Sequence, residues 1–127
     1  MILVDTDVAV DLIRKHPPAV SWFASLVTQP IWISGFTAFE LFAWCRNAAE
    51  QQALQQTLAS YRMVWLSSSG CETALVTYQN VHLANAISVT DMLIAQTALE
   101  LRLPLHTFNL KHFKAVAGLQ TIQPYIK

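Results

Sequence analysis

The stretch TDMLIAQTALELRLPLHTFNLKHF, residues 90–113, decides the fold that we predict for this chain. Its first half predicts a helix over residues 91–102, because apolar side chains form one stripe at positions 93, 94, 98 and 101. Pro104 ends the helical pattern, and the apolar run after it predicts a short strand over residues 105–107. Asn109 then begins another helix. A helix, a short strand and a helix in direct succession are typical of α/β proteins.

The rest of the chain alternates in the same way. Short apolar runs predict strands over residues 2–4, 31–33, 63–66 and 119–122, and helical spacing predicts helices over residues 8–15, 19–27, 37–47, 49–61, 71–83 and from 109 to about 118. Residues 67–70 are expected to form a loop. Parallel strands need crossover connections, so this order predicts a three-layer α/β/α fold with a central parallel sheet. We expect a single domain over residues 1–127.

Composition limits the possible partners. Hydrophobic residues make up 54% of the chain, more than the usual 45–50% or so, and this surplus suggests a covered protein interface. Eight basic residues balance eight acidic ones, so a nucleic-acid substrate would need a local basic patch or a bound cation. Neither a signal peptide nor a membrane span is apparent, and the two cysteines form no metal-binding or disulfide pattern. We expect a cytoplasmic protein.

Acidic residues recur where strands end and helices begin. Asp5 and Asp7 follow the first predicted strand, Glu40 follows the second, and Asp91 opens the long helix. Asn109 follows the strand over residues 105–107. Because the carboxyl ends of parallel strands lie along one edge of a sheet, these side chains are expected to converge.

A cluster of carboxylates calls for a cation. Two carboxylates about 4 Å apart repel each other by about 1 kcal/mol in water and about 4 kcal/mol near a protein surface. Mg²⁺ and Mn²⁺ prefer oxygen ligands, and such an ion can activate water for attack on a phosphodiester. The acids therefore indicate a metal-dependent phosphodiesterase.

Each acid also has a purely structural interpretation. Glu40 follows Thr37 at the spacing of a capping box, and Asp91 stands close behind Ser88, so both could tie down a helix start. Asp7 is more easily explained as a helix cap than as a ligand. Asp5 has no evident capping register, which makes it the firmest candidate of the set.

Three segments of the chain resemble a known family. ILVDTDVAVDLIRK (residues 2–15), ISGFTAFELF (residues 33–42) and the stretch over residues 90–113 are similar, in order and separation, to the three motif blocks of PIN domains of the VapC toxin type. The resemblance covers essentially the whole chain. It implies a PIN-like fold and an endoribonuclease that cuts single-stranded RNA with Mg²⁺ or Mn²⁺.

The resemblance also implies roles for individual residues. It assigns Asp5, Glu40 and Asp91 to the metal and to catalysis, Thr107 to a supporting hydroxyl near the site, and Asn109 to a position where many members have a fourth acid. It further implies a homodimer and a cognate, VapB-like antitoxin. The neutral Asn109 makes a second metal ion less favourable, and Asp7 replaces a common Asn and restores part of the charge.

Basic residues that could hold RNA are few. Residues 84–89 lack the basic and glycine residues that often precede the helix-opening acid in this family, so Arg46, Lys111 and Lys114 are the candidates for contacts with RNA phosphates.

Two other functions fit parts of the sequence. The D-x-D of Asp5 and Asp7 after an apolar strand also fits a haloacid-dehalogenase-like phosphatase, with Asp5 as nucleophile and Asp7 as acid/base, although the later lysine and acidic pair of that class have no plausible counterpart. The missing fourth acid also permits a catalytically weakened PIN-fold module that only binds a partner.

Overall fold

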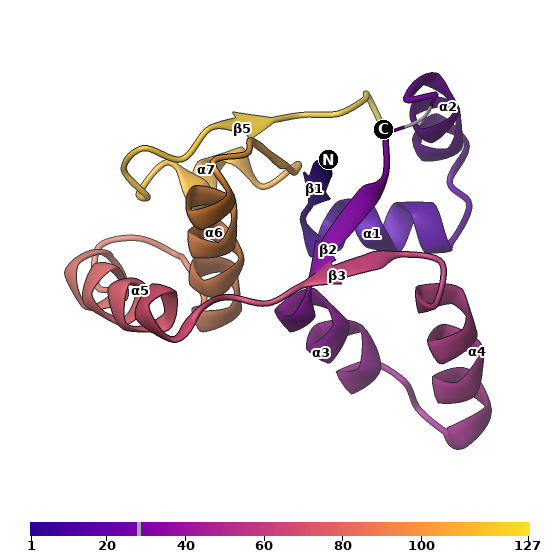
Figure 1. Ribbon diagram of the computed structural model, residues 1–127, viewed down its shortest axis with the longest axis horizontal. Coiled ribbons are helices and arrows are strands. Elements are labelled where there is room, and N and C mark those ends of the chain that lie inside the picture. The colour runs from indigo at the N-terminus through magenta and orange to yellow at the C-terminus, as the bar shows by residue number, and fades with distance from the viewer. Residues whose placement is uncertain (28) are drawn as a thin grey trace.

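Five parallel strands form the central sheet of the computed structural model, which describes residues 1–27 and 29–127 (Figure 1). The strand order is β3-β2-β1-β4-β5. The strands are β1 (Ile2–Val4), β2 (Ile31–Ser34), β3 (Arg62–Val64), β4 (Leu105–His106) and β5 (Thr121–Ile122). The helices are α1 (Thr6–Ile13), α2 (Pro17–Ser25), α3 (Gly35–Ala43), α4 (Ala48–Leu58), α5 (Ser68–Val81), α6 (Val89–Leu101) and α7 (Leu110–Phe113).

Helices cover both faces of the sheet. Ile2 and Val4 point to one face, where they pack in a core with side chains from α1, α2, α3 and α4. Leu3, between them, points to the other face and packs with side chains from α5, α6 and α7. A three-residue strand that is apolar throughout is thus buried on both sides, as its sequence predicted. The predicted three-layer α/β/α fold is confirmed.

Helix starts differ from the predicted ones because other side chains cap them. Asp5 accepts a hydrogen bond from the Thr6 backbone, so α1 begins at Thr6, and Asp7 lies inside its first turn. Ser67 caps α5, so the loop predicted over residues 67–70 is wrong. The last predicted helix is much shorter than expected, since α7 ends at Phe113.

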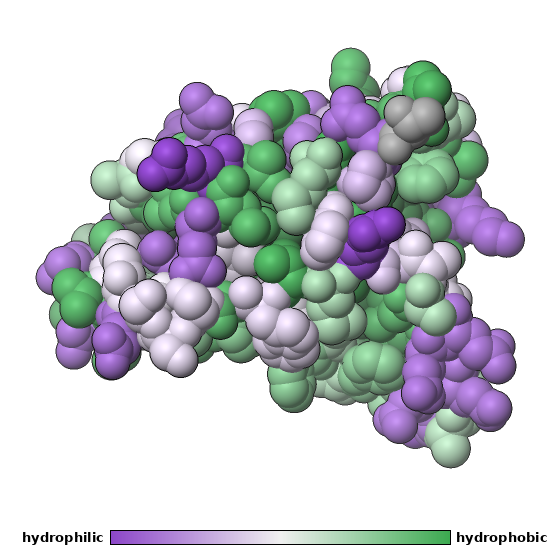
Figure 2. Space-filling view, viewed as in Figure 1, coloured by the Kyte–Doolittle hydropathy of each residue, from purple (hydrophilic) through white to green (hydrophobic). Residues whose placement is uncertain are grey.

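The surface carries both polar and apolar regions. Figure 2 shows polar side chains concentrated over α4, at the lower right, and hydrophobic side chains across the middle of the same face. Exposed large hydrophobic residues include Phe39, Trp44, Trp65 and Leu75. No helix within the described residues is long and apolar enough to cross a bilayer.

Gly35, the first residue of α3, is expected to tolerate no side chain. A Cβ atom there would lie 2.4 Å from the Trp65 ring. Gly35→Ala should therefore lower the free energy of unfolding by about 1–3 kcal/mol, measured by urea denaturation. The double variant with Trp65→Ala is the control, since it removes the obstacle. If Gly35→Ala alone is as stable as the unchanged protein, the indole moves aside at no cost and the prediction fails.

Candidate functional site

Asp5 occupies the centre of the candidate site, at the carboxyl end of β1. Its side chain is only 4% exposed, and it accepts hydrogen bonds of 2.8 Å from the Thr6 amide and from Oγ1 of Thr107. Burial, and next the negative charge of Asp7, raise its pKa to about 7, with a smaller contribution from Asp91, although the two hydrogen bonds act in the opposite direction. The expectation that Asp5 has no capping role is wrong, because it is the N-cap of α1.

Asp7 holds the loop that follows β4. Its Oδ1 accepts from the Val8 amide at 2.7 Å and its Oδ2 from the Phe108 amide at 2.9 Å. Burial raises the pKa of this carboxyl as well, against those two backbone hydrogen bonds. Asp7 is therefore not the helix cap that the sequence indicated. Its Oδ2 fixes the segment that carries Thr107, whereas its Oδ1 is bound within α1.

Thr107 joins the separate parts of the site. It is fully buried, and its hydroxyl donates to Oδ2 of Asp5 and lies 3.5 Å from Oδ2 of Asp7. The same oxygen accepts from the Asn109 amide at 2.9 Å. One hydroxyl thus connects β1, α1 and the start of α7.

Glu40 reaches the site from the second turn of α3. Ser34, not Thr37, caps that helix, so the capping-box interpretation of Glu40 is wrong. Instead, Oε1 of Glu40 accepts a 2.7 Å hydrogen bond from Oγ1 of Thr6, the residue after Asp5. Thr37 is buried and lies 3.0 Å from the same Thr6 oxygen. Sequence reasoning missed Thr6, because a threonine contact between two helices leaves no periodic signal.

Asp91 both caps α6 and belongs to the acidic group. It forms a capping box with Ser88, as the sequence allowed. Its charge nevertheless contributes to the raised pKa of Asp5, which places the two carboxylates within electrostatic range. His112 lies close by, with 3.8 Å between its Nδ1 and Oδ2 of Asp91.

Asn109 completes the group of predicted residues. Its backbone amide is bound by Thr107, and its Nδ2 lies 2.8 Å from Nδ1 of His112. Sequence reasoning assigned no role to His112, although it follows Asn109, the N-cap of α7, by three residues and therefore lies on the same side of the helix.

Among the basic side chains of the described residues, only His112 lies within 4 Å of one of these carboxylates, and the charge of Lys127 acts on Asp7 from a greater distance. Across residues 1–27 and 29–127, the ion pairs with acidic residues are Arg46 with Glu50, Lys127 with Asp11 and His112 with Asp91. Arg46 is highly exposed and lines a pocket of about 540 Å³ between α1, α3 and α4. Lys111 lies in α7 and Lys114 directly follows it. Both are exposed, and both are closer in the chain to Asn109 than Arg46 is.

Whether the site suits a divalent cation depends on the ligand atoms around Asp5 and on their charge. In the described part of the chain, no three acids, histidines or cysteines lie close enough together to form a complete protein ligand set. The donors gathered around Asp5 are oxygens, and the buried Asp5 and the half-buried Asp7 have no cationic partner within 4 Å among the described residues. Mg²⁺ suits such a site, because it takes few carboxylates and keeps several waters.

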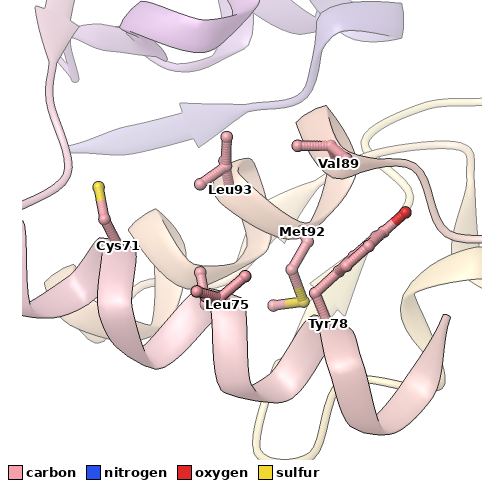
Figure 3. A pocket seen from close by; sticks show the side chains of 7 residues that line it. Cys71, Leu75, Tyr78, Val89, Met92 and Leu93 are labelled. Carbon is pink, nitrogen blue, oxygen red and sulfur yellow. The ribbon is translucent and has the colours of Figure 1, made fainter.

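An apolar pocket lies elsewhere and is not this site. It has a volume of about 270 Å³ and lies between α5 and α6, where Figure 3 shows Leu75 and Tyr78 facing Met92. Of the residues that line it, Val89 and Leu93 lie on the side of α6 opposite Asp91, given 100° per residue. Its lining offers almost no polar group, so it does not suit phosphodiester chemistry.

Comparisons with known proteins agree on one family. The model of the PIN domain matches residues 2–119. Ribonuclease VapC19 of Mycobacterium tuberculosis is 33% identical over an alignment 128 residues long, which includes 94% of this chain and 98% of the relative.

Solved structures show the same fold. A toxin–antitoxin complex from Klebsiella pneumoniae matches with a TM-score of 0.76 at 24% identity, covering 100% of both chains. VapBC-1 from nontypeable Haemophilus influenzae matches with a TM-score of 0.78 at 21% identity, covering 98% of both chains. VapBC2 from Rickettsia felis, bound to a DNA fragment from the promoter, matches with a TM-score of 0.72 at 25% identity, over 96% of this chain and 98% of that one.

Proposed function

Because this chain belongs to the PIN-domain family, we propose that it is a metal-dependent endoribonuclease, the VapC-type toxin of a toxin–antitoxin pair. The observation that carries the proposal is the buried Asp5, flanked by Asp7 and Asp91 and linked by Thr6 to Glu40 and by Thr107 to Asn109. A buried carboxylate with acidic neighbours and no basic partner within 4 Å among the described residues is a site for a cation.

The residues have separate roles in this proposal. Asp5, Glu40 and Asp91 would hold Mg²⁺ or Mn²⁺, and that ion supplies activation of water and offsets charge on the phosphoryl oxygens. Thr107 fixes the orientation of the Asp5 carboxylate, and Thr6 fixes that of Glu40. Oε2 of Glu40 receives no hydrogen bond from the described residues, so this oxygen would be available to the ion. In hydrolysis of the phosphodiester, the oxygen of water would form the new P–O bond as the bond to the leaving ribose oxygen breaks, and the proton that the water gives up would pass to that ribose oxygen.

Cleavage of RNA by the purified chain tests the proposal. Single-stranded RNA is incubated with the protein and Mg²⁺, Mn²⁺ or EDTA, and the products are resolved on denaturing gels. We expect cleavage with either ion, none with EDTA, and none with Asp5→Ala. Metal-dependent cleavage that survives in Asp5→Ala would come from a contaminant. A complete lack of cleavage would favour the binding-module alternative.

The phosphatase alternative has little support in the site. It requires a free Asp7 carboxyl as acid/base, yet both Asp7 oxygens accept backbone hydrogen bonds. Asp7→Asn is expected to reduce cleavage only in part, since the side-chain oxygen of the asparagine can still accept the hydrogen bond from the Phe108 backbone amide.

Partners follow from the same proposal. The solved relatives are complexes of a toxin with an antitoxin, and we propose a VapB-like antitoxin and a homodimer for this chain in the cytoplasm. Growth arrest on expression, relieved by the product of a short neighbouring gene and by Glu40→Gln, is the expected result. Light scattering gives the molar mass of the purified protein and so tests whether it is a dimer. Unaffected growth in all cases would contradict the toxin role.

Lys111 and Lys114 are expected to contact RNA phosphates. Each lost contact should reduce the slope of log affinity against log salt concentration by about 0.7 for a single strand. We therefore expect the double alanine variant to bind RNA more weakly and with a flatter salt dependence, measured by fluorescence anisotropy. Arg46→Ala tests the third candidate separately, and because Arg46 is paired with Glu50 we expect its salt slope to stay closer to that of the unchanged protein. Equal salt slopes for the three proteins would exclude contacts from the two lysines.

A further inference from the structure

Asn109 is a neutral side chain with two unlike ends. Its amide oxygen accepts hydrogen bonds and attracts a cation, whereas its NH₂ group donates and repels one. In an acidic site built to hold a cation, an asparagine is useful only when its oxygen is the free end. A carboxylate at this position would need no such control, because both its oxygens are acceptors.

His112 holds the nitrogen end of that amide. Nδ2 of Asn109 lies 2.8 Å from Nδ1 of His112. An amide nitrogen can only donate, so Nδ1 must accept and the ring carries its proton on Nε2. Oδ1 of Asn109 receives no hydrogen bond from any residue that the structure describes. The amide oxygen is therefore the end left available.

The backbone around this pair is fixed. The Asn109 amide donates to Thr107, whose hydroxyl donates to Asp5. Phe113, next to His112, is 1% exposed and anchors α7 in the core. Asp91 does not compete for the ring, since 3.8 Å from its Oδ2 to Nδ1 of His112 exceeds hydrogen-bond length.

We propose that His112 is a positioning residue, which orients the Asn109 amide so that its oxygen serves the cation site. The inference rests on the proposed metal-dependent function. Loss of an outer partner of a metal-site residue typically costs 10- to 100-fold in metal affinity or activity. We therefore expect His112→Ala to weaken Mn²⁺ binding and cleavage by about 10-fold.

A double-mutant cycle with Asn109→Asp separates positioning from mere support of α7. An aspartate needs no orientation, so His112→Ala should change Mn²⁺ affinity less than about twofold in the Asn109→Asp background. Affinity is measured by calorimetry on the protein without RNA, and cleavage in parallel. His112→Asn is the conservative variant, because its Oδ1 can take the place of Nδ1, and it should restore most of the loss. The same loss in both backgrounds, or no loss in either, would overturn the proposal.

A spectroscopic measurement adds a test that needs no activity. Nitrogen chemical shifts of ¹⁵N-labelled histidine should show His112 with its proton on Nε2 and an accepting Nδ1 in the unchanged protein. A proton on Nδ1 would contradict the assignment. If the unchanged protein binds Mn²⁺ but cleaves no RNA, the proposed function fails, while the binding cycle and the spectrum still decide the role of His112.

Discussion

Replacing Asp5 by asparagine is expected to abolish RNA cleavage and, at the same time, to raise the melting temperature of the metal-free protein at pH 8. The loss of activity should be about 100-fold or more, since even outer partners of metal ligands cost 10- to 100-fold. The gain in stability has a different cause. Burial, together with the charges of Asp7 and Asp91, raises the pKa of Asp5 to about 7 in the folded chain, against an ordinary value of 3.8.

The direction of this effect follows from proton binding. Between about pH 4 and pH 7 the unfolded chain loses the Asp5 proton while the folded chain keeps it, so rising pH favours the unfolded state. Above pH 7 the full cost of the raised pKa is present, at most about 4 kcal/mol. Asparagine has no proton to lose and escapes that cost.

Thermal melts at pH 5 and pH 8, with EDTA and with Mg²⁺, measure the effect of pH on stability and the stabilisation by the ion. The unchanged protein should melt lower at pH 8 than Asp5→Asn in EDTA, and Mg²⁺ should stabilise only the unchanged protein. Asp11→Asn is the control, because Asp11 lies in α1 but contacts Tyr125 and Lys127 instead of the site. The prediction is wrong if Asp5→Asn still cleaves RNA, or if its melting temperature at pH 8 equals that of the unchanged protein.

Ser88→Ala is expected to lower mainly stability, and Asp91→Asn mainly activity. Both residues belong to the capping box of α6, but only Asp91 carries charge. Ser88→Ala removes the N-cap hydrogen bond and should cost about 1 kcal/mol with little loss of cleavage. Asp91→Asn keeps a side-chain acceptor near the helix start, so we expect a smaller loss of stability and about a 100-fold loss of cleavage.

Urea denaturation and cleavage rates on the two variants separate the roles of Asp91. If both variants lose activity in proportion to their loss of stability, Asp91 serves only to cap the helix. If Asp91→Asn remains fully active, its assignment to the metal site is wrong.

The order and kind of most elements could be predicted because burial leaves a clear pattern. Uninterrupted apolar triplets such as Ile2–Val4 predict strands buried on both faces, and the sheet places Asp5 at the expected edge. The strand order β3-β2-β1-β4-β5 could not be predicted, since apolar periodicity does not say which strands pair.

The details of the site were harder to predict because several polar residues compete for each helix start. Ser34 and Thr37 both fit the cap of α3, and only the packing of Thr37 beside Thr6 decides between them. Asp5 was predicted to belong to the site but not to cap a helix, and in the structure it does both. His112 acts through another side chain, so the sequence pattern gave no reason to select it.

The pairing of β1 with β4 also has a consequence for when, during synthesis, the proposed activity could begin. Asp5 is translated early, yet the hydroxyl that orients it comes from Thr107, and β1 acquires its neighbour β4 through Leu105 and His106. A nascent chain that ends before these residues has an aspartate without its oriented environment. The proposed ribonuclease would thus stay inactive on the ribosome until residues 105–107 have emerged and paired with β1.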